Sequence, residues 1–378
     1  MKIYKLLKLI FISKFQFSAI PRKKVILFDC ENIKHLKPLF KKNEFFVLSV
    51  RYLNIKKIYL NNSILKNLIL KYSFKYSLKI NYLFAIINQI NPKLIITHID
   101  NSKDFYIVSK KLYQKINCVA VQMATRGDIM YNSLKKTKDI FIPNFFSLGN
   151  YEKSLYKKRR AKVKKFSPSG SLTAGLAQKY FIDKKKKNAL LYDICLISQP
   201  WDGLEFPQVK NFADTEGLIA KFTHKLCKEK KLKLIFIGKR RKNSLSGKQE
   251  LDFYNKYLGK DNFKILQPTK NNFQSYQMIL QSKLVVGHNS TLLRESLGFN
   301  KKVLFCNFTG SNLVQSISKG ILELKTPKYE NFKKRVLNIL SISKSSYFEK
   351  IDNNLNHIII PPSKTVKIIS SELKKMLI

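Results

Sequence analysis

The sequence predicts two α/β domains in series, each with an open, mostly parallel β-sheet covered by helices. Short apolar runs typical of buried strands alternate with longer stretches whose apolar residues recur at helical spacing. The alternation breaks once, at residues 157–175, where charge, Pro and Gly interrupt it, and then starts again. A chain of 378 residues is also longer than one hydrophobic core usually organises. Strands joined by helices form parallel βαβ units, so we expect two Rossmann-like sheets that face each other.

In the first half, five apolar runs predict strands, within 23–32, 45–52, 93–101, 117–126 and 139–145. Helices are expected at 63–75, 77–91 and 102–115, and the second of them stops at the Asn91-Pro92 pair. The basic segment 157–175 is interpreted as the end of the first domain, with the boundary between residues 170 and 187.

In the second half, the strands are expected within 189–200, 231–241, 263–268, 284–287 and 301–307. Helices are expected at 215–230, 247–258, 273–282, 288–300, 329–348 and 364–377. The predicted organisation is an N-terminal segment 1–20, an acceptor-side domain 21–175, a second domain 176–350 and a C-terminal helical segment 351–378.

The formal net charge is +48, because 72 Lys and Arg residues face only 24 Asp and Glu residues. The excess is mostly lysine and accompanies many Asn, Ile, Phe and Tyr residues, whose codons are rich in A and T, so genome composition explains part of it. The shortage of acidic residues still predicts a cationic surface that suits an acidic partner. No zinc-finger, helix-turn-helix or aromatic RNA-binding motif accompanies the charge, so nucleic acid is not expected as a partner.

The cysteines and histidines are scattered along the chain without metal-binding spacing. Most of the five cysteines lie in or beside apolar runs, as reduced core residues of a cytoplasmic protein do: Cys30, Cys118, Cys195, Cys227 and Cys306. Because the sequence contains no HExxH motif or Cys/His cluster, we expect neither a metal nor a cofactor.

Residues 1–20 form a basic and apolar segment. Its apolar core, Leu6 to Ile12, is interrupted by Lys8 and is too short to span a membrane. It also lacks a clear signal-peptide cleavage site. Two interpretations remain. The segment lies in the interface of an anionic membrane, on the inner face of the cytoplasmic membrane, or it packs on the protein's own surface.

Polar residues follow the expected strands, and ligands of open parallel sheets bind beyond these carboxyl ends. In the first domain they are Glu31, Asn32, His98, Asp100, Asn101, Arg126 and Asp128. In the second domain they are Ser198, Gln199, Lys239, Arg240, Arg241 and residues 287–291. The first set is acidic in character, and the second is cationic and rich in hydroxyl groups.

The segment GHNSTLLRE, residues 287–295, suits the phosphates and ribose of a nucleotide. Gly287 lets a ligand approach the backbone closely. Ser290 and Thr291 either cap the next helix or belong to a turn that presents N–H groups to a phosphate. Glu295 lies one helical turn beyond Thr291 on the same face, where a carboxylate can accept both ribose hydroxyls.

The remaining groups of the second domain have two interpretations each. His288, followed by Asn289, either donates to a phosphate oxygen or lies idle in an exposed turn. Lys239 and Arg240 either neutralise a diphosphate or form an ordinary solvated turn. Arg294 is expected to face solvent.

The chain resembles the bacterial surface-carbohydrate biosynthesis proteins, a family of glycosyltransferases with the two-Rossmann GT-B fold. The likeness rests on SYQMILQSKLVVGHNSTLLRESLGFNKKVLF (275–305), with support from THIDNSKDF (97–105), SPSGS (167–171), CLISQP (195–200) and FIGKR (236–240). It implies metal-independent transfer of a sugar or acidic sugar from a nucleotide-sugar donor to a glycan or lipid-linked acceptor. Enzymes of this fold commonly place a Glu on the ribose, which implies that role for Glu295.

Such a transfer needs a general base on the first domain. The candidates are Glu31, His98, Asp100 and Asp128. Glu31 directly follows the first strand and is predicted to be the base, whereas Asp29 is expected deeper in that strand. Asp100 is predicted to orient the acceptor, or to cap the next helix with Ser102.

Two other functions stay open. One is a polyol-phosphate transferase of the same fold, a class that relies on histidine-containing motifs in both domains. The other is a non-catalytic relative that binds a nucleotide sugar or an anionic glycan. Turnover of a donor by the purified protein separates this second alternative from an enzyme.

Overall fold

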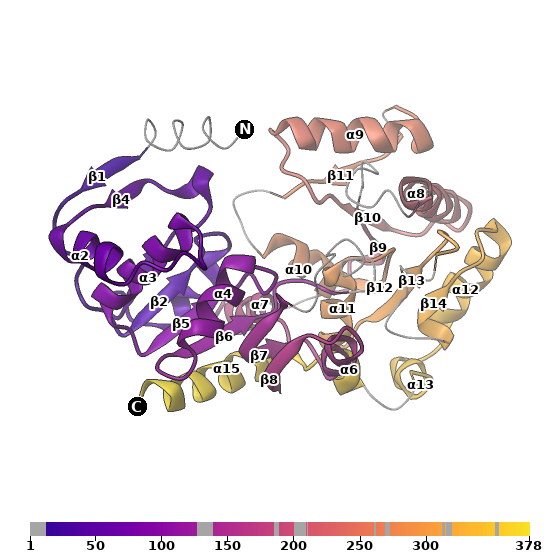
Figure 1. The fold of residues 1–378 in the computed structure, drawn as a ribbon. Coiled ribbons are helices and arrows are strands. Elements are labelled where there is room, and N and C mark those ends of the chain that lie inside the picture. The colour runs from indigo at the N-terminus through magenta and orange to yellow at the C-terminus, as the bar shows by residue number, and fades with distance from the viewer. Residues whose placement is uncertain are drawn as a thin grey trace.

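The computed structural model describes residues 13–126, 139–184, 189–199, 209, 211–260, 262–268, 273–311, 314, 320–351 and 355–378. Two six-stranded sheets form the cores of two domains that lie next to each other (Figure 1). Every pair of neighbouring strands in both sheets is parallel. The predicted fold class, two Rossmann-like α/β domains, is confirmed.

The N-terminal sheet has the strand order β3-β2-β5-β6-β7-β8. Its strands are β2 (Val25–Phe28), β3 (Phe45–Leu48), β5 (Leu94–Thr97), β6 (Asn117–Val121), β7 (Phe141–Ser147) and β8 (Lys162–Pro168). The chain runs from β2 to β3 on one side and then crosses to β5 on the other, so the strand order reverses between β2 and β5. All residues of β2 and β5 are buried, because both faces of the sheet are covered.

Helices from distant parts of the chain cover the two faces of this sheet. One face carries α2 (Asn62–Leu70), α3 (Leu78–Ile90), α4 (Lys103–Leu112) and α6 (Tyr151–Lys158), and the other carries α7 (Leu172–Asp183) and α15 (Pro362–Leu377). Ile26 of β2 joins the first core and Leu27 joins the second, as strand alternation requires. Ile369 and Leu373 of α15 complete the second core, so the C-terminal helix packs as part of the N-terminal domain.

The C-terminal sheet has the order β11-β10-β9-β12-β13-β14. Its strands are β9 (Tyr192–Ile197), β10 (Leu234–Ile237), β11 (Ile265–Leu266), β12 (Ser282–Gly287), β13 (Lys302–Cys306) and β14 (Glu323–Leu324). Its helices are α8 (Phe212–Glu229), α9 (Leu245–Leu258), α10 (Gln274–Leu280), α11 (Thr291–Gly298), α12 (Tyr329–Ser341) and α13 (Lys344–Glu349). The short α14 (Leu355–Ile358) precedes the return of the chain to the first domain. Here the strand order reverses between β9 and β12.

The basic segment 157–175 contains a strand, β8, that its charged composition did not predict. β8 is an edge strand that pairs only with β7, and its Lys162, Lys164 and Lys165 are exposed. Lysine and proline are tolerated at a sheet edge, where the unpaired side of the strand faces solvent. The expected end of the first domain, residue 175, lies inside α7.

Two smaller details also differ from the prediction. A short parallel sheet of β1 (Lys14–Gln16) and β4 (Lys57–Tyr59) was not expected. The expected helix 329–348 is two helices, because Ser343 caps α13 through a hydrogen bond from the Ser346 N–H at 3.0 Å. Most of the N-terminal segment, residues 1–12, lies outside the described residues. In the part of the chain that is described, no helix has the length and apolar character needed to cross a bilayer.

A fully buried ion pair joins the two domains. Arg294 in α11 donates from Nη1 to Oε1 of Glu152 at 2.6 Å and from Nη2 to Oε2 at 3.0 Å, and neither side chain is exposed. Its Nε donates to the carbonyl oxygen of Ile358 at 3.0 Å. Gln122 and the N–H of Gly149 complete the partners of Glu152 at 2.9 and 3.3 Å. The expectation that Arg294 faces solvent is therefore wrong, because the first domain and the segment before α15 enclose this side of α11.

Replacing Glu152 by Ala should lower the free energy of unfolding by about 3–5 kcal/mol, because it leaves the Arg294 guanidinium buried without its counter-charge. Thermal and urea unfolding measure this change. Asp104→Ala is the matched control, because it removes a surface ion pair with Lys79 at 2.5 Å that contributes about 1 kcal/mol or less. Equal losses in the two variants would contradict a central role for the buried pair.

Candidate functional site

The carboxyl ends of the two sheets meet at the domain junction. The N–H of Thr125, after β6, donates to Oγ1 of Thr291, after β12, at 2.9 Å. Burial, and then the charge of Arg241 after β10, lower the pKa of Lys34, which follows β2, so these two cations also approach each other. The strand exits of both domains therefore come together, as the topology of open parallel sheets leads one to expect for a ligand site.

His288 lies where the strand order of the C-terminal sheet reverses. It is buried, its ring centroid is 4.4 Å from that of Phe212, and its Nδ1 lies 3.1 Å from Oε1 of Glu216 in α8. Burial raises the pKa of Glu216, and the hydrogen bond with His288 acts against this rise. Nε2 of His288 has no hydrogen-bond partner, and neither has Oε1 of Gln199, which follows β9. These two buried atoms hold unused hydrogen-bonding capacity at the reversal point.

A buried carboxylate organises the loop after β10. Glu250 in α9 accepts the hydroxyl of Ser198 at 2.6 Å and the N–H groups of Lys239 and Arg240 at 2.7 and 3.0 Å. Gln267, after β11, donates to the same carboxylate at 3.3 Å. The side chains of Lys239 and Arg240 are exposed, whereas their backbone N–H groups and the Ser198 hydroxyl are already hydrogen-bonded to Glu250. Any contact of this loop with a diphosphate would therefore come from the basic side chains.

The helix after β12 begins as the sequence predicts. Ser290 caps α11, because its Oγ accepts the Leu292 N–H at 3.3 Å. A Cβ added at Gly287 would lie 3.3 Å from the carbonyl oxygen of Ile197, so a larger residue would crowd β9. Asn289 and Thr291 are half-buried beside this turn. The capping alternative thus holds for Ser290, and phosphate binding by this turn stays a prediction.

Glu295 is enclosed by neutral hydroxyl groups. Its Oε1 accepts the hydroxyl of Ser171, which caps α7, and its Oε2 accepts the hydroxyl of Tyr276 in α10 at 2.9 Å. Burial raises the Glu295 pKa to about 7, although the two hydrogen bonds and Arg294 act in the opposite direction. Glu295 shares the face of α11 that carries Thr291, and in this conformation that face seals against Ser171 and Thr125. A contact between Glu295 and ribose stays a prediction. It requires ribose hydroxyls to replace those of Ser171 and Tyr276 as hydrogen-bond donors to the carboxylate.

His98 lies at the corresponding reversal point of the N-terminal sheet, directly after β5. It is buried and neither of its ring nitrogens has a partner. Its ring centroid is 5.5 Å from that of His35 in η1 (Ile33–His35), which follows β2. Burial is the main cause that lowers the pKa of His98 to about 3 and that of His35 to about 4. Both rings are therefore neutral near pH 7, and each can accept one hydrogen bond and donate another.

Glu31, the predicted base, shares Arg51 with Asp29. β2 ends at Phe28, so Asp29 is the first residue beyond the strand and has a φ of 72°. Arg51 donates to Asp29 Oδ2 at 2.8 Å and lies 2.5 Å from Glu31 Oε2. Asp29 is buried, whereas the Glu31 side chain is 46% exposed. Glu31 thus lies at the expected strand exit, on its solvent side and paired with a cation.

Asp100 is enclosed by the loop after β6. Arg126 donates to both of its oxygens, with Nε at 2.8 Å from Oδ2, and the N–H of Met123 donates at 3.2 Å. The side chain that caps α4 is Ser102, not Asp100. These contacts give Asp100 a role in holding the loop, and an acceptor-orienting role stays a prediction. Asp128 lies outside the described residues.

Sequence reasoning did not single out the buried carboxylates Glu152, Glu216 and Glu250. Each lies on the apolar stripe of an amphipathic helix, where burying an acidic side chain without hydrogen-bond partners would destabilise the fold. Glu216, for example, stands four residues after Phe212, and Glu250 four residues before Tyr254, and both aromatic residues are buried. An acidic residue at such spacing is the signal that could have found them.

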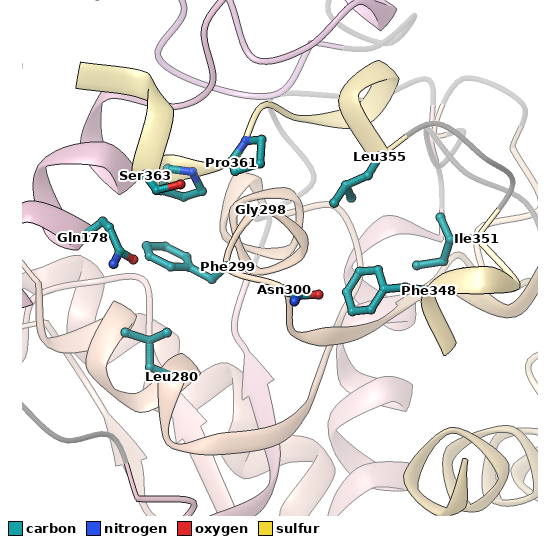
Figure 2. Close-up of a pocket in the computed structure, with 11 residues that line it drawn as sticks. Gln178, Leu280, Gly298, Phe299, Asn300, Phe348, Ile351, Leu355, Pro361 and Ser363 are labelled. Atoms are coloured by element: carbon teal, nitrogen blue, oxygen red, sulfur yellow. The ribbon is translucent and has the colours of Figure 1, made fainter. Parts of the chain in front are cut away.

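A cavity of about 670 Å³ lies away from this junction, between the end of α11 and the segments around α13 and α15 (Figure 2). Its lining includes Gln178, Phe299, Phe348 and Pro361. None of the predicted site residues is among the described residues that line it. The candidate site is therefore the strand-exit junction and not this cavity.

The raised pKa of Glu295 predicts a pH-dependent stability. Between about pH 4.5 and 7 the folded state keeps a proton on Glu295 that the unfolded state has released, so stability should fall as the pH rises through this range. The fall should amount to about 3 kcal/mol at most. Glu295→Gln should remove this slope, whereas Asp252→Asn, at an exposed residue of α9, should keep it. Urea unfolding at pH 5 and pH 8 measures the difference, and the same slope in all three proteins would contradict the assignment.

Solved structures with the same two-domain fold include enzymes of nucleotide-sugar and cell-wall chemistry. The structure of S. aureus MnaA with UDP is 15% identical, has a TM-score of 0.55, and the match covers 95% of this chain and 97% of that one. The UDP-GlcNAc 2-epimerase from Neisseria meningitidis bound to UDP-GlcNAc is 15% identical, with a TM-score of 0.54 and coverage of 94% and 100%. The wall teichoic acid polymerase TagF is 10% identical, with a TM-score of 0.52 and coverage of 94% and 88%. At these identities the likeness shows the fold, which is of the GT-B type.

Among curated proteins, none matches this chain. A family described as "putative O-antigen biosynthesis protein" matches residues 119–320, which is more than half of the chain. The matched region runs from β6 through the whole strand-exit site of the second domain, including the turn after β12 and Glu295. The chain therefore belongs to this family of O-antigen biosynthesis proteins.

Proposed function

We propose that the protein transfers a sugar, or an acidic sugar, from a nucleotide donor to a glycan or lipid-linked acceptor during synthesis of a surface polysaccharide. The family supports the biosynthetic context. The GT-B fold supports an enzyme, and similar structures bound to UDP and to UDP-GlcNAc support a nucleotide-sugar donor. A lipid-linked acceptor would also require the protein to work at a membrane surface.

The main support for this proposal is that buried side-chain atoms without hydrogen-bond partners occur mostly at the strand exits. Among the described residues, seven buried side-chain atoms have no partner, and five of them belong to strand-exit residues: His98, Thr125, Gln199 and His288. Buried polar atoms are rarely left unpaired in a folded protein unless a ligand, an ion or water completes them. Those of His98, Gln199 and His288 lie at the reversal points of the two sheets, where open α/β proteins bind ligands, and Thr125 follows the neighbouring strand β6.

The second domain has the chemistry to hold a donor. The phosphates would meet the start of α11, His288 and the basic side chains of Lys239 and Arg240. These groups stay in place during the reaction and can stabilise the negative charge that develops on a departing nucleoside diphosphate. Gln199 offers its unpaired amide oxygen to a hydroxyl or amino group of the donor.

The first domain supplies the base, and the contacts favour His98 over Glu31. Glu31 is half-exposed, and its carboxylate already forms an ion pair with Arg51. His98 is buried and both of its ring nitrogens lack partners, so either can meet the hydroxyl of an acceptor. Burial lowers the pKa of the ring to about 3, so proton uptake requires the negative charge of a bound donor. Glu31 remains the alternative that its place after the first strand predicts.

One observation favours a polyol-phosphate transferase as the second candidate. The structure places one buried histidine at each reversal point, His98 and His288, and that class relies on histidine-containing motifs in both domains. The donor distinguishes the two functions, because a sugar transferase would use a UDP-sugar or similar nucleotide sugar and a polyol-phosphate transferase would use a nucleotide-activated polyol phosphate.

A nucleotide panel tests the donor site. UDP, CDP, GDP and the matching activated sugars and polyols are compared by thermal shift, where a ligand at about 100 times its Kd stabilises the fold by about 2.7 kcal/mol. His288→Ala should weaken nucleotide binding by about 1.5–3 kcal/mol, since it removes a hydrogen bond to a charged group. His224→Ala, which changes a histidine of α8 bonded to the Asn262 carbonyl, should leave binding unchanged.

Three results would change the proposed function. Stabilisation by no nucleotide would remove it. Release of a product that differs from the donor only at one sugar carbon would assign epimerisation. Preferential use of a CDP-polyol would assign polyol-phosphate transfer.

The choice of base is tested by two isosteric changes. His98→Gln should keep donor affinity but lower turnover by about 10²–10⁴-fold, the usual contribution of a general base. Glu31→Gln should reduce turnover much less, because Arg51 keeps Asp29 as a partner. Single-turnover assays with donor and acceptor measure both. The opposite pattern would make Glu31 the base, as its position in the sequence predicts.

A further inference from the structure

We infer that α2 and the loop after it form a membrane-docking surface for an anionic lipid bilayer. This surface, residues 65–78, is called the α2 surface. It lies at the outer end of the N-terminal domain, away from the C-terminal domain (Figure 1). It is separate from the strand-exit site, so the inference does not depend on the proposed reaction, although a lipid-linked acceptor would give it a purpose.

α2 exposes three apolar side chains to solvent, together with Lys66. Leu65, Ile69 and Leu70 are 42%, 77% and 70% exposed, and Leu65 and Ile69, four residues apart, lie on the same side of the helix. The opposite face packs Ile64 and Leu68 into the domain core. A surface helix normally places polar residues opposite its buried stripe, and here Ile69 and Leu70 lie on that side next to Lys66. Single exposed apolar residues are ordinary, but a group of them on one face marks a contact surface.

The loop after α2 presents an aromatic residue to solvent on a fixed backbone. Phe74 is 97% exposed and its ring contacts only the edge of Tyr72 among the described aromatic rings, at 5.2 Å between centroids. Asn81, buried at the start of α3, bonds to both the N–H and the carbonyl of Ser73 at 3.0 Å. It also donates to the carbonyl of Tyr76 at 3.2 Å. The hydrogen bonds of Asn81 therefore fix the backbone on both sides of Phe74, whose ring extends into solvent.

The charge of this surface selects an anionic partner. No Asp or Glu occurs between residues 45 and 99, whereas Lys66, Lys71 and Lys75 are exposed within the α2 surface itself. Apolar side chains among lysines match a bilayer, because the apolar groups enter the interface and the ammonium groups remain at anionic head groups. Nucleic acid is bound mainly through its phosphates and base edges, so it would leave these aliphatic side chains exposed to water.

The start of the chain reaches the same region. The side chain of Asn61, which caps α2, donates to the carbonyl of Ser18 at 3.1 Å, directly after the short β1 strand. Phe17 is 69% exposed there. The preceding residues 1–12, MKIYKLLKLIFI, are themselves basic and apolar. Phe17 therefore adds an exposed aromatic side chain beside the start of α2.

The test is co-sedimentation with phosphatidylglycerol-containing vesicles and with phosphatidylcholine vesicles. The wild-type protein should bind the anionic vesicles and come off as salt increases, because lysine attraction is screened. Ile69→Ser/Phe74→Ser should reduce vesicle binding by about tenfold or more, since two side chains no longer enter the interface. Ile182→Ser/Leu245→Ser, which changes two residues that are 62% and 75% exposed elsewhere, is the matched control and should bind as the wild type does.

Four outcomes would overturn the inference. They are no vesicle binding by the wild type, wild-type binding by Ile69→Ser/Phe74→Ser, an equal loss in the control variant, or loss only when residues 1–12 are deleted. A change of oligomeric state caused by Ile69→Ser/Phe74→Ser in light scattering would instead make the α2 surface a self-association face. Nucleotide stabilisation, measured on the same variants, reports on the donor site separately, so failure of either proposal is recognisable by itself.

Discussion

The Arg294–Glu152 ion pair determines how the two halves of the site meet. It joins α11, which carries the turn expected to bind phosphate, to α6 in the first domain and to the Ile358 carbonyl on the returning chain. A Cβ at Gly149 would lie 2.5 Å from the His357 carbonyl oxygen, so only glycine lets the two backbones pass this closely. A buried ion pair adds little stability compared with well-packed apolar residues, but removing one partner leaves the charge of the other buried and uncompensated, which is strongly destabilising. The pair therefore fixes orientation more than it strengthens the fold.

The placement of acidic residues follows from the same constraint. Among the described residues, six acidic residues are buried, namely Asp29, Asp100, Glu152, Glu216, Glu250 and Glu295. All six lie at strand exits or on helices that face the junction, where they accept N–H, hydroxyl or guanidinium donors and hold loops in place. The exposed surface is thereby left with even fewer carboxylates than the composition indicates. Part of the cationic surface is thus a consequence of how the site is built.

Apolar periodicity was enough to predict the parallel sheets, since β2, β5 and residues 284–287 of β12 are continuous buried runs and their helices have clear stripes. It failed for β8, because an edge strand needs no apolar face and its lysines look like a linker. The strand exits listed from the sequence include His98, Gln199 and His288, whose buried atoms lack hydrogen-bond partners. The partners of these side chains could not be predicted, because Glu152 meets Arg294 and Ser171 meets Glu295 across more than a hundred residues of sequence. The likeness of β12 and α11 to a known family suggested the reaction class that we propose, which periodicity alone does not contain.

The buried histidines impose an electrostatic order on the proposed reaction. Burial is the largest cause that lowers the pKa of His98, and His35 and Arg126 act in the same direction while Asp100 opposes them, so the ring is a weak base in the absence of ligand. A buried position beside a guanidinium is thus a poor place to take up a proton. A bound donor changes this, because its negative charge offsets the cations and favours the protonated ring. Binding of the donor would then prepare His98 as the base, and an acceptor hydroxyl that arrived first would meet a ring that takes up protons only weakly.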